Sequence, residues 1–332
     1  MSLTNRQVLL ASRPSGAVTE ANFQIVDVPL GAPRDGEVLV RNRWLSLDPY
    51  MRGRMSDAKS YAPSVQLGEV MVGQTVGEVL ESRDPRYRPG DTVLTALGWQ
   101  LYGIAKADAV STVDARRVSP SYYLGILGMP GITAWIGLNE VAKLQASETV
   151  VVSAASGAVG SVAGQLAKIA GCRVIGIAGG RAKCDYVVSS LGFDACIDRK
   201  VDTWKDELRA ACPDGVDVDF ENVGGAVLDG VLGLMNTASR VVLCGLIAEY
   251  NARERYDHNL RQVLVKRIRM QGMIVFDWEH RYAEAVGVLR AHLEAGRFRY
   301  RESVVDGLDN APRGLIALLN GENFGKQLVK LV

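Results

Sequence analysis

The chain has 332 residues, of which 48% are hydrophobic and 23% charged, and its formal net charge at pH 7 is +1. This length suggests about two domains, and the composition supplies ample material for hydrophobic cores. The near-neutral charge argues against nucleic acid or an anionic membrane as a partner, because both select strongly basic surfaces.

Cysteine and histidine are sparse in the sequence. The five cysteines show no Cys-x-x-Cys spacing, which indicates reduced thiols. The three histidines, His258, His280 and His292, do not lie at metal-ligand spacing from one another or from a cysteine, so we expect no metal site. The same scarcity argues against nucleophilic catalysis by a Ser-His or Cys-His pair. The chain begins MSLTNR, without the apolar segment of a secretory signal, and we expect a cytoplasmic protein.

Short strand-like segments separated by Pro- and Gly-rich turns fill the chain up to about residue 120. The predicted strands are 7–10, 23–28, 37–45, 71–81 and 91–97. Their spacing and turn chemistry predict a compact, barrel-like β domain.

After Pro120, helical segments alternate with apolar strands. The predicted strands are 149–153, 173–178, 195–197, 216–221, 240–244 and 270–275. This alternation predicts a doubly wound parallel sheet, which a long helix over about 278–295 closes. Residues 301–305 and 327–331 are strand-like again, so we expect the chain to return to the first domain.

The stretch from 149 to 171 organises this second domain. Residues 149–152 form a β-branched run typical of a strand buried on both faces, and only small residues separate them from a helical pattern. A bare backbone at a helix N-terminus can bind a diphosphate. The pattern is A-x-G-x-x-G, because Ala155 stands where the dinucleotide fingerprint has its first glycine. Alone, it also fits a structural turn of another α/β protein.

The end of the strand predicted at 173–178 indicates which dinucleotide is bound. NAD sites usually carry a carboxylate there, which accepts hydrogen bonds from the ribose hydroxyls. Here Gly179 and Gly180 are followed by the cations Arg181 and Lys183. They suit the extra phosphate of NADPH, since a charge-assisted hydrogen bond contributes about 1.5–3 kcal/mol. The alternative is a solvated pair at the start of the next helix.

Three further motifs are expected near the same site. Ligands bind beyond the carboxyl ends of parallel strands, and two predicted strands lead into residues 220–225 (FENVGG) and 244–251 (CGLIAEYN). In the first domain, residues 47–53 (LDPYMRG) form a turn that leads into an expected single helical turn. Each motif alone is compatible with ordinary turn chemistry, but their joint placement favours a functional site.

The sequence resembles the zinc-independent medium-chain dehydrogenase/reductase superfamily, in the branch of prostaglandin reductases, plant alkenal double-bond reductases and bacterial NADPH-dependent curcumin reductase. The segments that carry this resemblance are LDPYMR at 47–52, LGMPGITA at 127–134, SGAVGS at 156–161, ENVGG at 221–225, CGLIAEYN at 244–251 and GENFGK at 321–326. The bacterial curcumin reductase type is the most similar, including GGRAKC at 179–184. The zinc-binding Gly-His-Glu of alcohol dehydrogenases is missing, because the comparable region reads LGEVMVG.

The resemblance implies a fold and an assembly. A GroES-like, β-barrel-type substrate domain would comprise residues 1–121 and 299–332, and a Rossmann domain that binds NADP would comprise residues 122–298. The resemblance also implies a homodimer and a small-molecule enone or enal as the substrate.

The resemblance further implies particular site residues. It assigns the diphosphate to Gly157, Ala158, Val159 and Gly160. It assigns the 2′-phosphate to Lys183 beside Gly180, and Arg199, where many relatives have tyrosine, could reach the same phosphate. The other implied cofactor contacts are Asn222, Cys244, Gly245, Leu246, Ile247, Tyr250, Met273, Ile274, Val275 and Asn323. Weaker candidates for shaping the substrate cleft are Tyr50, Arg52 and Tyr61.

A reaction follows from the hydride donor. Hydride would add to the β-carbon of an alkene conjugated to a carbonyl, and negative charge would develop on the carbonyl oxygen as an enolate. A hydroxyl aimed at that oxygen lowers the barrier, and loss of such a donor typically costs about 2.7–4 kcal/mol. Tyr250 is the predicted donor, because a tyrosine with an ordinary pKa near ~10 stays protonated at neutral pH. The alternative is that Tyr250 only packs against the nicotinamide ribose.

The predicted function is therefore NADPH-dependent reduction of the carbon–carbon double bond of α,β-unsaturated ketones or aldehydes. One alternative is an NADPH-dependent quinone oxidoreductase on the same fold, which turnover of quinones rather than enones would reveal. Another is a non-catalytic NADPH-binding or redox-sensing protein, which would bind NADPH without oxidising it.

Overall fold

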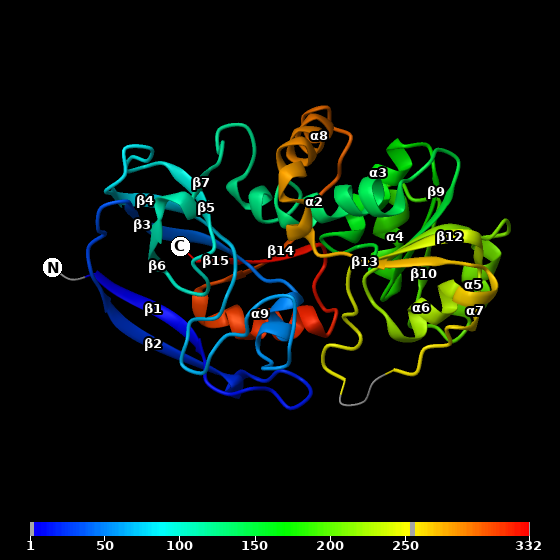
Figure 1. The fold of residues 1–332 in the computed structure, drawn as a ribbon, viewed down its shortest axis with the longest axis horizontal. Coiled ribbons are helices and arrows are strands. Elements are labelled where there is room, and N and C mark those ends of the chain that lie inside the picture. Colours follow the sequence, from blue (N-terminus) through cyan, green and yellow to red (C-terminus); the bar gives the residue numbers. More distant parts are fainter. Residues whose placement is uncertain (1–2, 253–255, 332) are drawn as a thin grey trace. The chain divides into compact units, whose positions relative to one another are not determined.

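The computed structural model describes residues 3–252 and 256–331. The chain divides into two compact units (Figure 1). Unit 1 comprises Met1–Gly125 and Glu302–Val332, and unit 2 comprises Ile126–Arg301. Both ends of the chain therefore contribute to unit 1, as the strand-like pattern after residue 301 predicts.

Unit 1 is built mainly from strands. These are β1 (Leu3–Leu10), β2 (Phe23–Leu30), β3 (Glu37–Ser46), β4 (Thr75–Ser82), β5 (Thr92–Thr95), β6 (Tyr102–Lys106), β7 (Ser111–Thr112), β14 (Glu302–Asp306) and β15 (Lys326–Lys330). Its α-helices are α1 (Tyr50–Arg54) and α9 (Ala311–Leu319). Its 3-10 turns are η1 (Glu20–Asn22), η2 (Ala107–Ala109), η3 (Pro120–Leu124) and η6 (Leu308–Asn310).

The main sheet of unit 1 runs in the order β14-β15-β3-β4-β5-β7, and β6 also pairs with β3. Successive side chains of a strand point to opposite faces, and inward residues of β3, β4 and β5 meet in one core that includes Val38, Val40, Val79 and Val93. Sequence reasoning missed β6 and β7. These strands have only five and two residues, which is too short for an alternating pattern to stand out.

A second core of unit 1 lies under the two α-helices. Met51 of α1 and Leu315 of α9 are fully buried in one cluster with Trp99 and with Val329 of β15. The C-terminal strand and helix thus pack on the segment that carries the LDPYMRG motif. The single helical turn predicted after that motif is confirmed as α1.

Unit 2 alternates strands and helices. Its strands are β8 (Thr149–Ser153), β9 (Arg173–Ala178), β10 (Ala195–Asp198), β11 (Val216–Glu221), β12 (Met235–Leu243) and β13 (Arg269–Gly272). Its α-helices are α2 (Met129–Ile136), α3 (Gly160–Ile169), α4 (Arg181–Ser189), α5 (Trp204–Ala211), α6 (Gly225–Leu232), α7 (Arg261–Val265) and α8 (Tyr282–Glu294). A π-helical turn, η4 (Gly137–Ala142), follows α2, and a 3-10 segment, η5 (Val275–Arg281), precedes α8.

The sheet of unit 2 has the order β10-β9-β8-β11-β12-β13 and is parallel throughout. The predicted doubly wound Rossmann sheet is confirmed. Every residue of β8 is buried, as expected for a strand covered on both faces. Helices α5 and α6 pack on one face, and α3 packs against β8, β9 and α2 (Figure 1). The strand order reverses between β8 and β11, where such sheets bind ligands at their carboxyl ends.

Three boundaries in unit 2 differ by three residues or more from the sequence prediction. β12 begins at Met235 rather than 240, and β13 ends at Gly272 rather than 275. The last helix begins only at Tyr282, because Trp278 has non-helical angles (φ −118°, ψ 29°) and interrupts the preceding turn. In the parts of the chain that the structure describes, no helix combines the length and the apolarity that crossing a bilayer requires.

Candidate active site

A glycine cradle connects β8 to α3 at the carboxyl edge of the sheet. The Gly157 N–H donates to the Ala154 carbonyl (2.8 Å), and the Ser161 N–H donates to the Gly157 carbonyl (3.0 Å). A Cβ atom placed on Gly160 would lie 2.5 Å from the Ala154 oxygen, so no larger residue fits without moving the backbone. The turn therefore presents bare backbone at the start of a ten-residue helix, as a diphosphate requires.

Ala155 departs from the dinucleotide fingerprint, and the neighbouring strand accommodates it. Its methyl group is fully buried, and a Cβ on Gly176 of β9 would lie only 2.8 Å from it. The space for the Ala155 methyl is therefore provided by the glycine across the sheet. The signal was present in the sequence as a glycine inside an otherwise β-branched strand.

Three cationic side chains surround the turn after β9. Burial lowers the pKa of the Lys183 ammonium, and the nearby positive charges of Lys200 and Arg199 lower it further. The Arg199 Nε and the Lys200 Cε lie 3.6 Å and 3.5 Å from the position that a Cβ on Gly179 would occupy. These positive charges repel one another, and an anionic ligand bound between them would relieve that repulsion.

The carboxylate of Asp198 fixes this turn. Its Oδ1 accepts hydrogen bonds from the Gly180 N–H (2.7 Å) and the Lys200 N–H (3.0 Å). Arg181, which the sequence offered as one of the two phosphate-binding cations, instead pairs with Asp185 on the exposed face of α4 (2.8 Å). Lys200 was missed, although it directly follows Arg199 in the sequence.

The turn between β11 and α6 is organised by the buried carboxylate of Glu221. Its Oε1 accepts hydrogen bonds from the Ser153 hydroxyl (2.7 Å), the Gly224 N–H (2.8 Å) and the Val223 N–H. Burial raises the pKa of this carboxyl, and the hydrogen bonds oppose that rise. The Asn222 side-chain amide donates to the Ser153 carbonyl (2.8 Å). Asn222 is thus held at the end of β8, beside the glycine cradle.

The loop after β12 lies along the same edge. Two of its amides, Gly245 and Ile247, donate to the carbonyls of Glu221 (3.1 Å) and Asn222 (3.2 Å). Burial raises the pKa of the Cys244 thiol to about 12, and the charge of Glu221 adds to the shift. The Tyr250 side chain lies against this loop, and its hydroxyl accepts a hydrogen bond from the Leu246 N–H (3.4 Å). The structure therefore gathers Asn222 and the residues from Cys244 to Tyr250.

The segment Met273–Val275, which the prediction assigns to the cofactor site, follows β13. The Met273 N–H donates to the Leu243 carbonyl (3.1 Å), and the Met273 and Val275 side chains are buried. A Cβ on Gly137 would lie 3.1 Å from the Met273 sulfur, so this side chain packs into the core.

In unit 1 the candidate cleft residues gather around α1. Arg54 lies between the rings of Tyr50 and Tyr61, with its Cζ 5.9 Å and 5.6 Å from the two ring centroids. Burial raises the pKa of the Tyr50 hydroxyl, and the charge of Asp48 adds to the shift. Arg52 is turned toward its own unit, because its Nη2 donates to the Gly16 carbonyl (2.8 Å). That contact favours a structural role for Arg52.

A buried ion pair joins the C-terminal strand to the LDPYMRG motif. The Lys326 Nζ lies 2.6 Å from Asp48 Oδ1 and donates to the Leu47 carbonyl (2.8 Å). The Ser46 hydroxyl donates to the other oxygen of Asp48. Asn323 lies in the loop just before this strand, where its amide donates to the Gly325 carbonyl (2.7 Å). The motifs at 47–52 and 321–326 therefore meet in unit 1.

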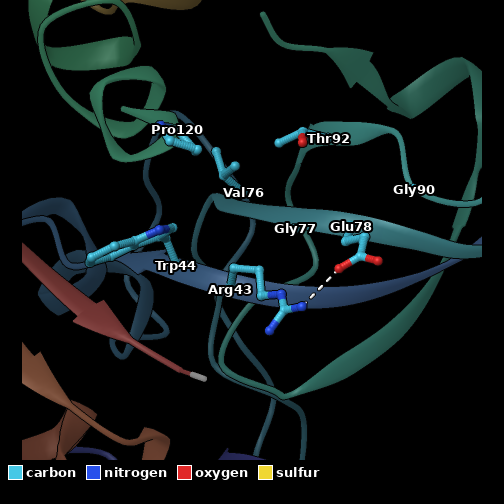
Figure 2. Close-up of a pocket in the computed structure, with 8 residues that line it drawn as sticks. All are labelled: Arg43, Trp44, Val76, Gly77, Glu78, Gly90, Thr92 and Pro120. Carbon is cyan, nitrogen blue, oxygen red and sulfur yellow. Dashed lines mark hydrogen bonds and ion pairs between the residues drawn. The ribbon is translucent and has the colours of Figure 1, made fainter. Parts of the chain in front are cut away.

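Unit 1 also holds a cavity of about 340 Å³ that contains none of the predicted site residues. Figure 2 shows its lining, which consists of Arg43, Trp44, Val76, Gly77, Glu78, Gly90, Thr92 and Pro120. Hydrogen bonds from Arg43 and Arg41, both shorter than 3.0 Å, lower the pKa of the Glu78 carboxyl. The charged groups of this cavity thus neutralise one another.

Comparison with known proteins identifies the family. Residues 6–113 match the family model described as the N-terminal domain of oxidoreductase, and residues 158–291 match the model described as zinc-binding dehydrogenase. The chain is 46% identical to the NADPH-dependent curcumin reductase of Escherichia coli, over 98% of this chain and 97% of that protein. It is 42% identical to the NADP-dependent 2-alkenal reductase of Nicotiana tabacum, over 98% and 97%.

A solved structure agrees with these relatives. CurA of Vibrio vulnificus in complex with NADPH has a TM-score of 0.95 and 47% identity, over 98% of this chain and 99% of that one. The chain belongs to the medium-chain dehydrogenase/reductase family. It lies in the branch that contains the curcumin and alkenal reductases, and it is an oxidoreductase with the two-part fold of that family.

The residues of this medium-chain reductase fit a phosphorylated dinucleotide. The cradle at Gly157–Gly160 has no room for a Cβ at its closest point, and three cations cluster beyond the neighbouring strand. Although the second family model is described as zinc-binding, the described residues contain no cluster of three or more His, Cys, Asp or Glu side chains suited to a metal ion.

Proposed function

We propose that this medium-chain reductase uses NADPH to reduce the carbon–carbon double bond of α,β-unsaturated ketones and aldehydes. The observation that carries the proposal is the position of Tyr250. Its hydroxyl lies over Gly245 and Leu246, in a loop bonded to the end of β11 at the same sheet edge as the glycine cradle. The printed names of the curcumin and alkenal reductases support this reaction class.

In this proposal unit 2 binds the cofactor. Residues Gly157–Gly160 hold the diphosphate through backbone N–H groups, and Lys183, Arg199 and Lys200 hold the 2′-phosphate. Asn222 and the loop from Cys244 to Ile247 line the remainder of the cofactor. The functional domains are proposed at 1–121 with 299–332 and at 122–298, so Tyr50, Tyr61 and Asn323 come from the substrate domain.

The chemistry asked of the protein is limited. When bound, NADPH supplies a hydride to the β-carbon, and a proton from the Tyr250 hydroxyl or from water completes the reduction at the α-carbon. The Tyr250 hydroxyl donates a hydrogen bond to the substrate carbonyl oxygen and stabilises the negative charge that develops there. The protein also orients the substrate, since correct placement of reacting groups can contribute several orders of magnitude in rate.

The decisive experiment replaces the proposed donor. Tyr250→Phe removes one hydroxyl and should lower kcat for an enone by about 10²–10³-fold, because a single donor to an oxyanion contributes that much. The dissociation constant for NADPH, measured by fluorescence titration, should change less than about threefold. Tyr102→Phe, which changes a tyrosine in β6 of unit 1, serves as the control and should behave as wild type.

A substrate screen separates the remaining possibilities. NADPH oxidation is measured with enones, enals and quinones, and the screen is repeated with NADH. Turnover of quinones alone would point to a quinone reductase, and NADPH binding without oxidation of NADPH would point to a sensing protein. A Tyr250→Phe variant with wild-type kcat would rule out the hydrogen-bond donor role of Tyr250 while leaving the reductase assignment open.

We also propose that the protein is a homodimer. Strand β13 is an edge of the six-stranded sheet, and the helix before it exposes apolar side chains. Both features favour association with a second copy.

A further inference from the structure

His258 joins two acidic side chains of unit 2 that the proposed reaction does not use. Its Nδ1 lies 3.1 Å from Asp229 Oδ1, and its Nε2 lies 3.0 Å from Glu249 Oε1. Asp229 belongs to α6, whereas Glu249 directly precedes Tyr250 in the loop after β12. One imidazole ring thus connects the tyrosine-bearing loop to a helix of the core.

The Glu249 carboxylate is also seated on the start of α6. Its Oε1 accepts a hydrogen bond from the Gly225 N–H (3.1 Å). A Cβ on Gly224 would lie 2.6 Å from the same oxygen, and Gly224 has a positive φ of 77°. Glycine at position 224 therefore leaves room for the Glu249 carboxylate. The partial positive charge at the start of α6 stabilises the negative charge of this carboxylate.

Only the protonated ring can satisfy both partners. An ionised carboxylate accepts hydrogen bonds and cannot donate them, whereas a neutral imidazole has one donor and one acceptor nitrogen. Partial burial lowers the pKa of His258, but the hydrogen bonds to Asp229 and Glu249 and their charges outweigh it and raise the pKa above 6.5. The bridge is therefore complete below pH 6.5 and is lost as the pH rises through the raised pKa.

Two neighbours in its own segment also surround the His258 ring. The Tyr256 ring packs on His258 with a centroid distance of 4.8 Å. Burial and the negative charges of Asp229 and Asp257 raise the pKa of the Tyr256 hydroxyl, so it stays neutral while His258 titrates. Among the described residues, the titratable groups in contact with His258 are thus Asp229 from α6, Glu249 from the loop and Tyr256 from its own segment, and Asp257 directly precedes it in the chain.

The bridge acts on one part of the loop. Up to Ala248 the loop is held by main-chain bonds, including Ile247 N–H to the Asn222 carbonyl (3.2 Å) and Ala248 N–H to the Val223 carbonyl (2.9 Å). Beyond Ala248, the Glu249 and Tyr250 N–H groups donate within the loop, to the carbonyls of Leu246 (2.9 Å) and Ile247 (3.4 Å), and the Glu249 side chain connects the loop to the start of α6 by accepting from the Gly225 N–H (3.1 Å). Release of Glu249 would therefore disturb Tyr250 more than the residues proposed to line the cofactor.

We propose that His258 is a positioning residue whose protonated ring holds Glu249, and with it the backbone of Tyr250, in the arrangement that lets the Tyr250 hydroxyl donate a hydrogen bond to the substrate. This inference rests on the proposed role of Tyr250. It makes turnover depend on the protonation of a side chain that touches neither substrate nor cofactor.

The test compares pH profiles of kcat for an enone. Wild type should lose about tenfold in kcat as the pH rises through the titration of His258, because the geometry of the donor is lost. His258→Gln, which is neutral at every pH, should show the low value throughout, and His258→Arg, which is always charged, should keep the high value at high pH. Asp229→Asn removes one of the two carboxylates and should move the midpoint to lower pH by about one unit.

Two controls and two outcomes sharpen this test. His280→Gln changes an exposed histidine in η5 and should leave the profile unchanged. The NADPH dissociation constant of each His258 variant should stay within about threefold of wild type. An unshifted midpoint in Asp229→Asn, or a His258→Gln profile identical to wild type, would overturn the proposal.

A second measurement separates this inference from the enzymatic one. The free protein has only three histidines, so their ring resonances can be assigned with one variant each and titrated by NMR. The His258 resonance should titrate above pH 6.5, and amide hydrogen exchange of residues 249–252 should quicken about tenfold once it is deprotonated. If exchange follows the titration of His258 but no substrate is turned over, the positioning role of His258 is supported and the proposed function fails. If exchange does not follow the titration of His258, the proposed positioning role of His258 is wrong.

Discussion

Lys183 carries much of the proposed preference for NADPH. It is half-buried in the first turn of α4, and burial together with Lys200 and Arg199 lowers the pKa of its ammonium. A bound phosphate would offset this repulsion, because each cation would then face an anion. Arg181, only two positions earlier, pairs with Asp185 while its side chain is 87% exposed, which leaves it little to contribute.

Substitutions at these residues give a direct test of cofactor choice. Lys183→Gln should weaken NADPH binding by about tenfold or more, since it removes a charge-assisted hydrogen bond, and should leave NADH binding unchanged. Lys200→Gln should act in the same direction. Arg181→Gln is the matched control with little expected effect, and titration of each variant with both nucleotides is the measurement. An equal loss for Arg181→Gln and Lys183→Gln would show that the phosphate contacts are assigned to the wrong cations.

At the scale of elements, the buried pair of Asp48 and Lys326 connects β15 to the turn before α1. The Lys326 side chain is only 1% exposed, and burial lowers the pKa of its ammonium although Asp48 opposes the shift. The pair positions the helical turn that carries Tyr50. It couples the last strand of the chain to a motif almost 280 residues earlier in the sequence.

Breaking this pair should destabilise unit 1. Lys326→Met leaves the Asp48 carboxylate buried without its partner, and the expected loss is about 3–5 kcal/mol in the free energy of unfolding. Lys330→Met, at the exposed end of the same strand, is the control and should change stability little. Denaturant unfolding followed by far-UV circular dichroism measures the free energy of unfolding of both variants. A loss below about 1 kcal/mol for Lys326→Met would contradict the structural role of the pair.

Strong periodic patterns made some elements predictable. The bounds of β8, β9 and β11 match the prediction because each strand is almost wholly buried and bounded by turns, and β8 and β9 are rich in β-branched residues. The end of β13 and the start of α8 were wrong, since the intervening 3-10 segment shows no clear period in sequence. Elements set by tertiary packing rather than by local pattern were therefore the ones missed.

In the candidate site, too, local motifs were predictable and contacts set by tertiary packing were not. The glycine cradle and the Tyr250 loop could be proposed from local motifs and from resemblance to a family. The position of Lys200 and the bridge from Asp229 through His258 could not, because the bridge joins residues 29 positions apart whose meeting depends on how α6 and the loop fold. Arg52 was proposed for the cleft, and its bonds to the carbonyls of Gly16 and Pro14, which favour a structural role, could not be read from the sequence.

At the scale of the whole molecule, an apolar edge of unit 2 is the proposed dimer interface. Helix α7 exposes Leu264 and Val265, and Leu260 just before it is also exposed. The helix leads directly into the edge strand β13. A contiguous apolar surface beside an open sheet edge invites association, and a second copy of the chain is the proposed occupant.

A charge placed in this surface should split the proposed dimer. Leu264 is 79% exposed, so Leu264→Glu should leave the fold of the monomer intact while it places a carboxylate in the interface. Sedimentation velocity should then show the wild type at twice the chain mass and the variant at the chain mass. Leu67→Glu, which changes an exposed leucine of unit 1, should remain dimeric. A monomeric wild type would remove the proposal, and a dimeric Leu264→Glu would move the interface to another face.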